Sequence, residues 1–280
     1  MTSTSKSLHT KVALLAAASA FAIMGTLGVA HAQKAIVVKP DLKSIAQAVQ
    51  RNADYNEIQN VMGQHAFYHG AGKNCDELKA IWATKSGDDT FSNPRGSWVG
   101  LTNIYNSYCL ANTNNQKKAL EALRAKYPEI KDSPESYGVG DFLIHTLTTP
   151  IIEVAGDGKT AKGMWYSPGV MVGAKPDGTA SGIWFFEKYG VDFAKEDGQW
   201  KIWHIQMFYD FTGPLEHGLA DVPTQRDMSK VEAGEKPQED PLMKMQKENP
   251  NSYKDWGPTT VPVMIPMPKP YYTFSETFSY

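Results

Sequence analysis

The sequence changes character near Asp141, and this change constrains the fold more than any other feature. Upstream, apolar residues recur at helical spacing. Downstream, runs rich in aromatic and β-branched residues alternate with glycine-centred turns. The runs span residues 142–154, 160–172, 183–194 and 200–211, and the turns between them, at 156–158, 176–178 and 197–198, are typical of β-hairpins. Helices followed by an antiparallel meander predict an α+β fold, with the helices packed on one face of a curved sheet.

The helical part is expected to begin with two separate helices. A short amphipathic helix is predicted over 41–49, and Asp54 with Glu57 has the spacing of a capping box that would open the second. His65 and His69 fall on or beside the apolar face of this second helix. Three further helices are predicted: one after a repeated capping pattern at 74–77, one over 98–108 and one over 120–127.

The N-terminal residues 1–32 have the pattern of a secretory signal. Two lysines precede an apolar run, which ends in Ala30-His31-Ala32. The alternative is a membrane anchor, but the run is short for a bilayer span. We therefore expect cleavage before Gln33, a periplasmic or secreted product, and no membrane association after cleavage.

The C-terminal residues 212–280 form a proline-rich arm. Ten of the seventeen prolines fall between Pro214 and Pro270, which excludes sheet interior and long helix there. The arm ends in more aromatic residues than a solvated tail carries, namely Tyr271, Tyr272, Phe274, Phe278 and Tyr280. We expect it to wrap its own domain or a neighbouring subunit, and the protein to be a homodimer or higher homo-oligomer. The other predicted segments are a lead-in helix over 33–53 and the main domain over 54–211.

Cys75 and Cys109 are the two cysteines of the chain. In an oxidising compartment they could pair, but the sequence does not establish that their Cα atoms come within bonding range, so both alternatives stay open here. His65 and His69 have metal-ligand spacing on a helix without an evident third ligand. We expect neither a metal nor a cofactor.

Charge and composition exclude several classes of function. The net charge is -2, and basic residues are scattered among acids, which argues against a nucleic-acid partner. Glycine-rich segments lack the lysine of a phosphate-binding loop, and no serine nucleophile elbow occurs. Aromatic residues make up 11% of the chain, which suits a pocket for a flat organic ligand, although an aromatic core gives the same count.

Several segments occur in a characteristic order: His65-Ala66-Phe67-Tyr68, Asp76-Glu77-Leu78-Lys79-Ala80-Ile81-Trp82-Ala83, Asp88-Asp89-Thr90-Phe91, a run from His145 to Pro150, and Glu196-Asp197-Gly198-Gln199-Trp200. In this order residues 54–211 resemble the SnoaL-like family of the nuclear transport factor 2-like superfamily. The resemblance implies a cone whose sheet wraps around the helices and encloses one deep, largely apolar cavity. It also implies relatives that are dehydratases, isomerases or cyclases beside others that only bind, so fold does not decide the chemistry. A helical insertion over 112–134 and the proline-rich arm depart from the family pattern.

Three histidines on separate predicted elements are candidate proton carriers, because imidazole titrates near neutral pH. His65 lies on a helix, and His145 begins the first strand, where the dehydratase branch of the family carries a pocket histidine. His204 shares one face of the last strand with Ile202 and Phe208. We expect His204 to point toward the helices and to share a cavity with His145. The alternative for each is a buried histidine held by a backbone carbonyl.

Aromatic side chains supply the remaining candidate site residues. Tyr68, one turn beyond His65, and Tyr166 in the second strand are candidate donors to a substrate oxygen, with core packing as the alternative. The side chains expected to contact the ligand are Trp82, Trp165, Trp184 and Phe208.

Two functions fit these residues. The first is a cofactor-free lyase, dehydratase or isomerase that acts on an aromatic or polycyclic small molecule by general acid-base catalysis with His and Tyr. The second is a non-catalytic periplasmic protein that binds a small molecule in the same cavity. A third function, with less support, is that of an assembly module whose cone serves mainly to form dimers. Motifs alone do not separate the first two.

Overall fold

A single helix, α1 (Leu42–Gly70), replaces the two helices predicted at the start of the domain. Asp41 caps it by accepting the amide N–H of Ser44. Asp54 is not a cap, because its buried carboxylate accepts hydrogen bonds from Lys195 and Trp200 of the sheet. The chain continues as helix through the predicted boundary, since the carboxylate that would have capped a new helix makes a tertiary contact instead.

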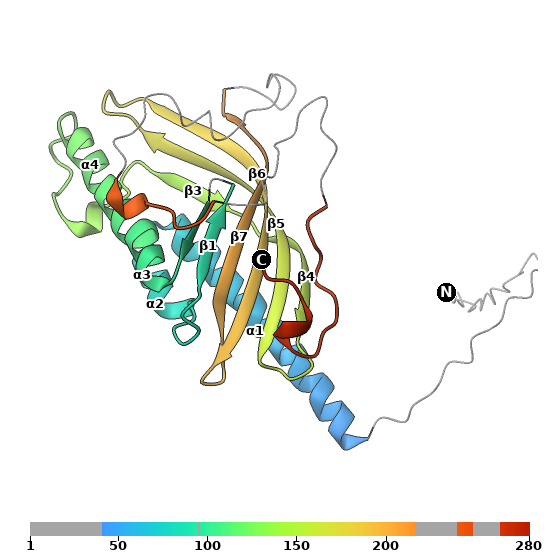
Figure 1. The fold of residues 1–280 in the computed structure, drawn as a ribbon. Helices are drawn as coiled ribbons and strands as arrows, with labels where there is room; N and C mark the ends of the chain where they lie inside the picture. Colours follow the sequence, from blue (N-terminus) through green and yellow to red (C-terminus); the bar gives the residue numbers. More distant parts are fainter. Residues whose placement is uncertain (1–40, 95, 217–239, 249–263) are drawn as a thin grey trace, which may run out of the picture. The chain divides into compact units, whose positions relative to one another are not determined.

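The computed structural model describes residues 41–94, 96–216, 240–248 and 264–280. They belong to one compact unit, Asp41–Tyr280, and the predicted signal peptide lies outside the described residues. After α1 the elements are α2 (Asn74–Ile81), β1 (Thr90–Asn93), β2 (Gly96–Val99), α3 (Leu101–Ile104), the π-helix η1 (Tyr105–Ala111), α4 (Asn112–Arg124), η2 (Pro134–Ser136), β3 (Phe142–His145), β4 (Thr148–Val154), β5 (Thr160–Ala174), β6 (Ala180–Glu196), β7 (Gln199–Pro214), η4 (Pro241–Met243) and η5 (Phe274–Glu276) (Figure 1). Within the described part of the chain, no helix has the length and apolarity needed to cross a bilayer.

The strands form one seven-stranded sheet in the order β2-β1-β7-β6-β5-β3, with β4 also paired to β5. Strands β5, β6 and β7 form the antiparallel meander that the sequence predicts, which confirms the α+β class. The first predicted run is divided in two. β3 pairs with β5 around Met171, and β4 pairs with it around Met164. β4 is itself irregular at Thr149, whose φ is 53°.

The hairpin β1–β2 was not predicted. Trp98, expected on a helix, lies in β2, and the helix starts only at Leu101. Gly100 makes this break possible, because its φ of 81° is readily adopted by glycine. β1 also pairs in parallel with β7, which makes the sheet mixed. Strands of four residues carry too little alternation to be told from a helical turn by sequence.

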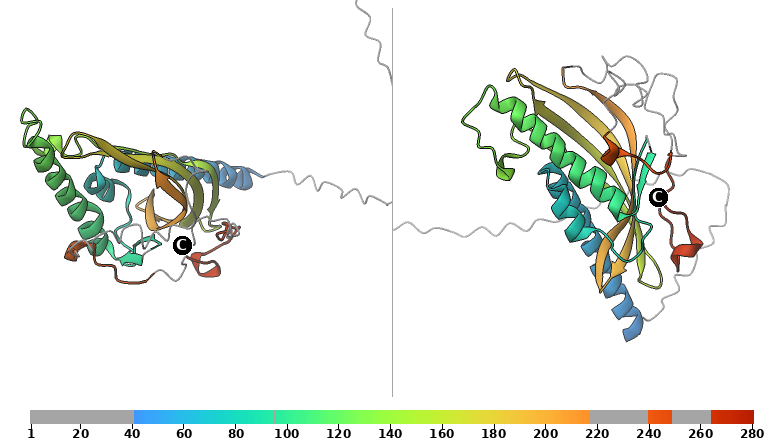
Figure 2. Two further views of the ribbon diagram at one scale, coloured as in Figure 1. Left: turned by 90° about the horizontal axis from the view of Figure 1, so that it is seen from above. Right: turned by 60° about the vertical axis from the view of Figure 1, so that its left-hand side comes forward.

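The helices and the C-terminal segment 264–280 lie on opposite faces of the sheet. In Figure 1, α1 passes behind the strands, whereas the C-terminal segment lies in front of them. Trp82, Trp165 and Trp200 belong to the main core on the helical side. The β5–β6 turn reaches the C-terminal end of α4, where Lys126 donates a hydrogen bond to the carbonyl of Asp177 (Figure 2).

An irregularity in β7 decides which of its side chains face the helices. Ile202 pairs with Phe193, but His204 already pairs with Asp192, so one extra residue is inserted between them. Such a β-bulge inverts the alternation of side chains. Ile202 therefore lies in the core beside the helices, whereas His204 and Phe208 point to the opposite face. The prediction that these three residues share one face is wrong.

Candidate functional site

A cavity of about 1040 Å³ lies between the helices and the sheet. Polar side chains at its wall include His65, His69, Tyr108, His145, Glu187 and Tyr189, and apolar ones include Phe91, Trp98, Phe185 and Met207. Cavities of this size accept a drug-sized organic molecule. An apolar wall with a few converging polar groups is the usual form of a small-molecule site.

Glu77 organises the helical side of the cavity. Its carboxylate is fully buried and accepts hydrogen bonds from His65 Nδ1 at 2.8 Å, Trp82 Nε1 at 3.1 Å and the Tyr108 hydroxyl at 2.8 Å. The sequence placed Glu77 in a capping box, but α2 has no side-chain cap. Three donors satisfy a buried charge that would otherwise be costly.

These contacts fix the positions of the protons. An ionised carboxylate only accepts, so His65 donates from Nδ1 and leaves Nε2 unprotonated. The single hydroxyl hydrogen of Tyr108 goes to Glu77, so His69, whose Nδ1 lies 2.8 Å from that hydroxyl, must donate to it. His65 Nε2 is buried and has no hydrogen-bond partner among the described residues. A buried acceptor without a partner is costly, which favours a hydrogen bond from a molecule bound in the cavity to this atom.

The sheet side of the cavity contributes a second imidazole–carboxylate pair. His145 Nδ1, on β3, lies 2.9 Å from Oε1 of the buried Glu187, on β6. The same nitrogen lies 3.4 Å from the Tyr189 hydroxyl. Glu187 holds the hydrogen on Nδ1, so Nε2 of His145 is the proton acceptor. The ring of Phe185 lies 4.7 Å from that of His145.

His69 lies between the two pairs. Its ring centroid is 4.7 Å from that of His145 and 5.8 Å from that of His65. Burial, followed by the neighbouring His145 and His65, holds the pKa of His69 well below its ordinary value. His69 is therefore neutral at physiological pH.

The two tyrosines stay protonated. Burial raises the pKa of Tyr108 well above its ordinary value, and the charge of Glu77 adds to the shift. Burial, with Glu187 as the next cause, does the same for Tyr189. Both phenols are thus hydrogen-bond donors over the whole physiological range. Each also has a carboxylate partner, since Tyr108 donates to Glu77 and the Tyr189 hydroxyl has a hydrogen bond with Glu187. Tyr189 lies beside His145, 3.4 Å from its Nδ1, and is therefore the candidate to act on a substrate together with that imidazole.

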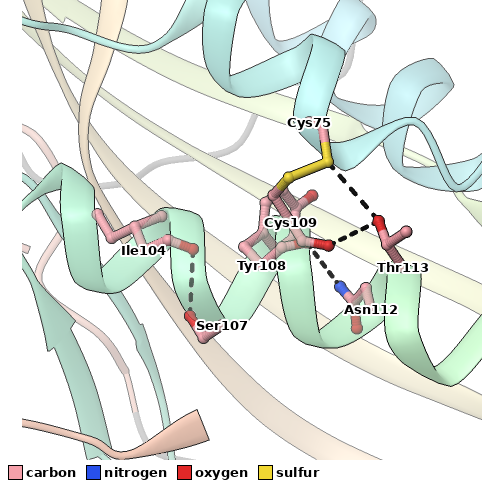
Figure 3. The surroundings of a disulfide bond; sticks show 7 residues. All are labelled: Cys75, Ile104, Ser107, Tyr108, Cys109, Asn112 and Thr113. Carbon is pink, nitrogen blue, oxygen red and sulfur yellow. Dashed lines mark hydrogen bonds between the residues drawn. A yellow bond between two sulfur atoms is a disulfide. The ribbon is translucent and has the colours of Figure 1, made fainter. Parts of the chain in front are cut away.

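A disulfide joins the elements that carry the Glu77 network. Cys75 on α2 pairs with Cys109 on η1, with Cα atoms 4.7 Å apart (Figure 3). Each cysteine lies within two residues of a network member, Glu77 or Tyr108. The π-helical geometry of η1 is found frequently at functional sites, where it redirects side chains. The pairing that the sequence left open is therefore present.

The structure places the predicted site residues in three groups. His65 and His145 line the cavity together. Trp82 and Trp165 are buried in the core on the helical side, where they donate to Glu77 and Gln59. The remaining residues lie away from the cavity: Tyr68 is outside its wall, His204, Phe208 and Trp184 lie on the opposite face, and Tyr166 on that face is 49% exposed.

Sequence reasoning missed Glu77, Tyr108, Glu187, Tyr189 and the position of His69 in the cavity. A signal was available for Glu187 and Tyr189, because period-two alternation puts them on the same face of β6 as Phe185 and Val191. The predicted shared cavity of His145 and His204 is wrong, since the bulge in β7 turns His204 away. In the described part of the chain, no three His, Cys, Asp or Glu side chains converge as metal ligands.

The layered α+β fold with one histidine-lined cavity defines the cone class expected from the sequence. A profile of the SnoaL-like domain matches residues 50–206, which is more than half of the chain. The chain therefore belongs to the SnoaL-like family, and its fold is of the nuclear transport factor 2-like kind.

The other comparisons give one negative result and several solved structures of low sequence identity. No functionally curated protein matches the sequence. An NTF2-like protein with a cystatin-like fold from Novosphingobium aromaticivorans is 14% identical, with a TM-score of 0.40 over 66% of this chain and 96% of that one. The hexachlorocyclohexane dehydrochlorinase LinA-type3 from Novosphingobium barchaimii LL02 is 18% identical, with a TM-score of 0.40 over 63% and 99%.

Proposed function

We propose that the protein is a cofactor-free lyase, dehydratase or isomerase that acts on an aromatic or polycyclic small molecule. The observation that carries this proposal is the convergence of two carboxylate-held imidazoles, His145–Glu187 and His65–Glu77, on one largely apolar cavity. A carboxylate at Nδ1 orients the ring, leaves Nε2 as the proton acceptor and stabilises the imidazolium that forms. Such a group suits removal of a proton from carbon beside an activating carbonyl or phenol.

In this proposal His145 is the general base, and the Tyr189 hydroxyl donates a hydrogen bond to the substrate oxygen. The C–H proton goes to His145 Nε2, the C–H electrons form a double bond, and the carbon–oxygen bond breaks. The His145 imidazolium then gives its proton to the leaving hydroxyl, which departs as water and leaves the imidazole neutral again. Tyr189 keeps its hydrogen because of its raised pKa, so it can stabilise an oxygen on which negative charge develops. In an isomerisation, the imidazolium returns the proton to a different carbon.

An elimination assay separates this enzyme from a binding protein with the same cavity. The aldol of benzaldehyde with acetone is a suitable first aryl β-hydroxy ketone, because its dehydration gives a conjugated enone with strong ultraviolet absorbance. We expect enone formation that depends on His145. Saturable binding across a panel of such ketones, with no turnover of any member, would instead support the non-catalytic binding protein.

The proposal includes export of the mature protein. The Cys75–Cys109 disulfide supports it, because thiols are kept reduced in the cytosol and pair in the periplasm or outside the cell. Expression of the whole sequence in a bacterial host should give periplasmic protein whose N-terminus is Gln33. Uncleaved protein in the cytosolic fraction would contradict export.

A further inference from the structure

A second cluster of buried charges lies on the face of the sheet opposite the cavity. Lys162 on β5 and Asp192 on β6 are both fully buried, and their charged atoms lie 2.5 Å apart. His204 on β7 places Nδ1 2.9 Å from Oδ2 of the same aspartate. None of the three lines the catalytic cavity. Two buried ions need further partners to offset the loss of hydration.

Those partners come from the C-terminal segment. Asp192 Oδ2 accepts hydrogen bonds from the Ser279 hydroxyl at 2.9 Å and the Tyr280 amide at 3.0 Å. Lys162 Nζ lies 4.6, 4.4 and 5.2 Å from the ring centroids of Phe274, Phe278 and Tyr280. Three aromatic rings around one ammonium form a cage that stabilises the cation.

The sheet is also shaped to fit this segment. A Cβ on Gly156 or Gly190 would lie 2.3 Å from the ring of Tyr272 or Tyr280, so only glycine leaves room for these rings. The amides of Gly156 and Asp157 donate to the carbonyls of Tyr271 and Tyr272 at 2.9 and 3.1 Å. Backbone pairing at one end and fitted rings along the segment are features of peptide recognition.

We propose that this face is a peptide-binding groove, formed by Lys162, Asp192, His204, Gly156 and Gly190, whose ligand is the chain's own aromatic segment 271–280. The segment forms no strand with the sheet and meets the groove through side chains and a few backbone groups. In this proposal it is a ligand that can leave the face, and Ile265, which precedes it and is buried against Met164 and Phe208, adds an apolar anchor. β6 carries Asp192 on this face and Glu187 on the other, so one strand serves both the groove and the cavity.

The test starts from the full chain, folded before it is cut. A site-specific protease sequence is introduced within residues 249–263 and cleaved in the folded protein, so that 264–280 is held by non-covalent contacts alone. Gentle warming and gel filtration then remove the fragment, and a fluorescein-labelled peptide of residues 264–280 is titrated by anisotropy. Because the protein is unchanged, variants can be placed in the peptide, where they cannot disturb folding.

We expect the labelled peptide to bind saturably and to be displaced by the unlabelled peptide but not by a shuffled one. F278A and Y280A in the peptide should each weaken binding about tenfold or more, because each removes a ring from the Lys162 cage. M264A is the matched control, since Met264 is 75% exposed, and should bind as the parent does. In the protein, Lys162→Met should also weaken binding about tenfold. A fragment that neither leaves nor exchanges, or equal binding of parent, F278A and shuffled peptides, would overturn the proposal.

Discussion

The imidazole rings of His69 and His145 lie 4.7 Å apart, although they come from a helix and a strand 76 positions apart in the sequence. Two imidazoles at this distance do not both carry a charge without strong repulsion. Only His145 has a carboxylate partner, Glu187. The arrangement agrees with the proposed roles of the two rings, since His145 is the proposed base and His69 stays neutral beside it.

The low pKa of His69 predicts a specific dependence of stability on pH. The unfolded chain binds a proton at this residue as the pH falls below about 6.5, whereas the folded chain does not until lower pH. The unfolded state then binds more protons, so the free energy of unfolding decreases as the pH falls through this window. Urea unfolding at several pH values should show the loss. His69→Gln should reduce it, and an unchanged pH slope in that variant would contradict the assignment.

Loss of the proposed base should strongly reduce turnover without unfolding the protein. His145→Gln is expected to lower kcat by about a hundredfold or more, the usual contribution of a general base. Tyr189→Phe should lower kcat by a smaller factor. Tyr166→Phe is the matched control, because Tyr166 is 49% exposed on the opposite face. Steady-state kinetics on the enone-forming assay measure all three, and equal losses for Tyr189→Phe and Tyr166→Phe would refute the role of Tyr189.

Removal of the Tyr108 hydroxyl should destabilise the helical side of the cavity. Tyr108→Phe removes the hydroxyl that donates a hydrogen bond to buried Glu77 and accepts one from His69. We expect the free energy of unfolding to fall by about 1–3 kcal/mol. Tyr105→Phe, on the same helical segment but 41% exposed, should change stability by less than about 0.5 kcal/mol. Denaturant midpoints at constant slope give both values. Similar midpoints for the two variants would show that the network contributes little.

The disulfide should stabilise the fold and the network together. Its closed loop spans 34 positions, for which the chain-entropy estimate gives about 3–4 kcal/mol. A Cys75→Ser, Cys109→Ser double variant should therefore melt at lower temperature, and reducing agent should lower the melting temperature of the parent but not that of the variant. A parent that is insensitive to reductant under conditions where free thiols are detected would contradict this.

Filling the open space beside Gly173 should block ligand binding. Gly173 lines the cavity, and a Cβ there would meet only Asp141, at 3.4 Å. Gly173→Leu should fold and reduce the binding of anilinonaphthalene sulfonate, an apolar fluorescent probe, about tenfold. Gly63→Ala on α1, with no atom within 4 Å of its added Cβ, is the control and should bind the dye normally. Unchanged dye affinity in Gly173→Leu would contradict this prediction and show that the dye binds outside the cavity.

The sequence by itself determined the class of fold and the strand runs. Period-two alternation and the Asp-Gly and Gly-Asp-Gly turns are local signals, and they identified β5, β6 and β7 to within a few residues. Local signals also placed His65 and His145 on separate elements that meet in the structure. The disulfide was left open, because pairing depends on a distance between two helices that no local pattern encodes.

Only the tertiary structure decided which side chains form the site. Asp54 and Glu77 each stood in a capping pattern, yet both are buried and bind side chains distant in sequence, because a buried carboxylate gains more from several fixed donors than from one helix end. The sequence prediction put His204 on the wrong face of β7 because it did not include the single residue inserted before it. Strand alternation has period two, so one bulge inverts the side chains beyond it. A bulge forms where packing of the whole sheet requires it, so the sequence of one strand does not reveal it.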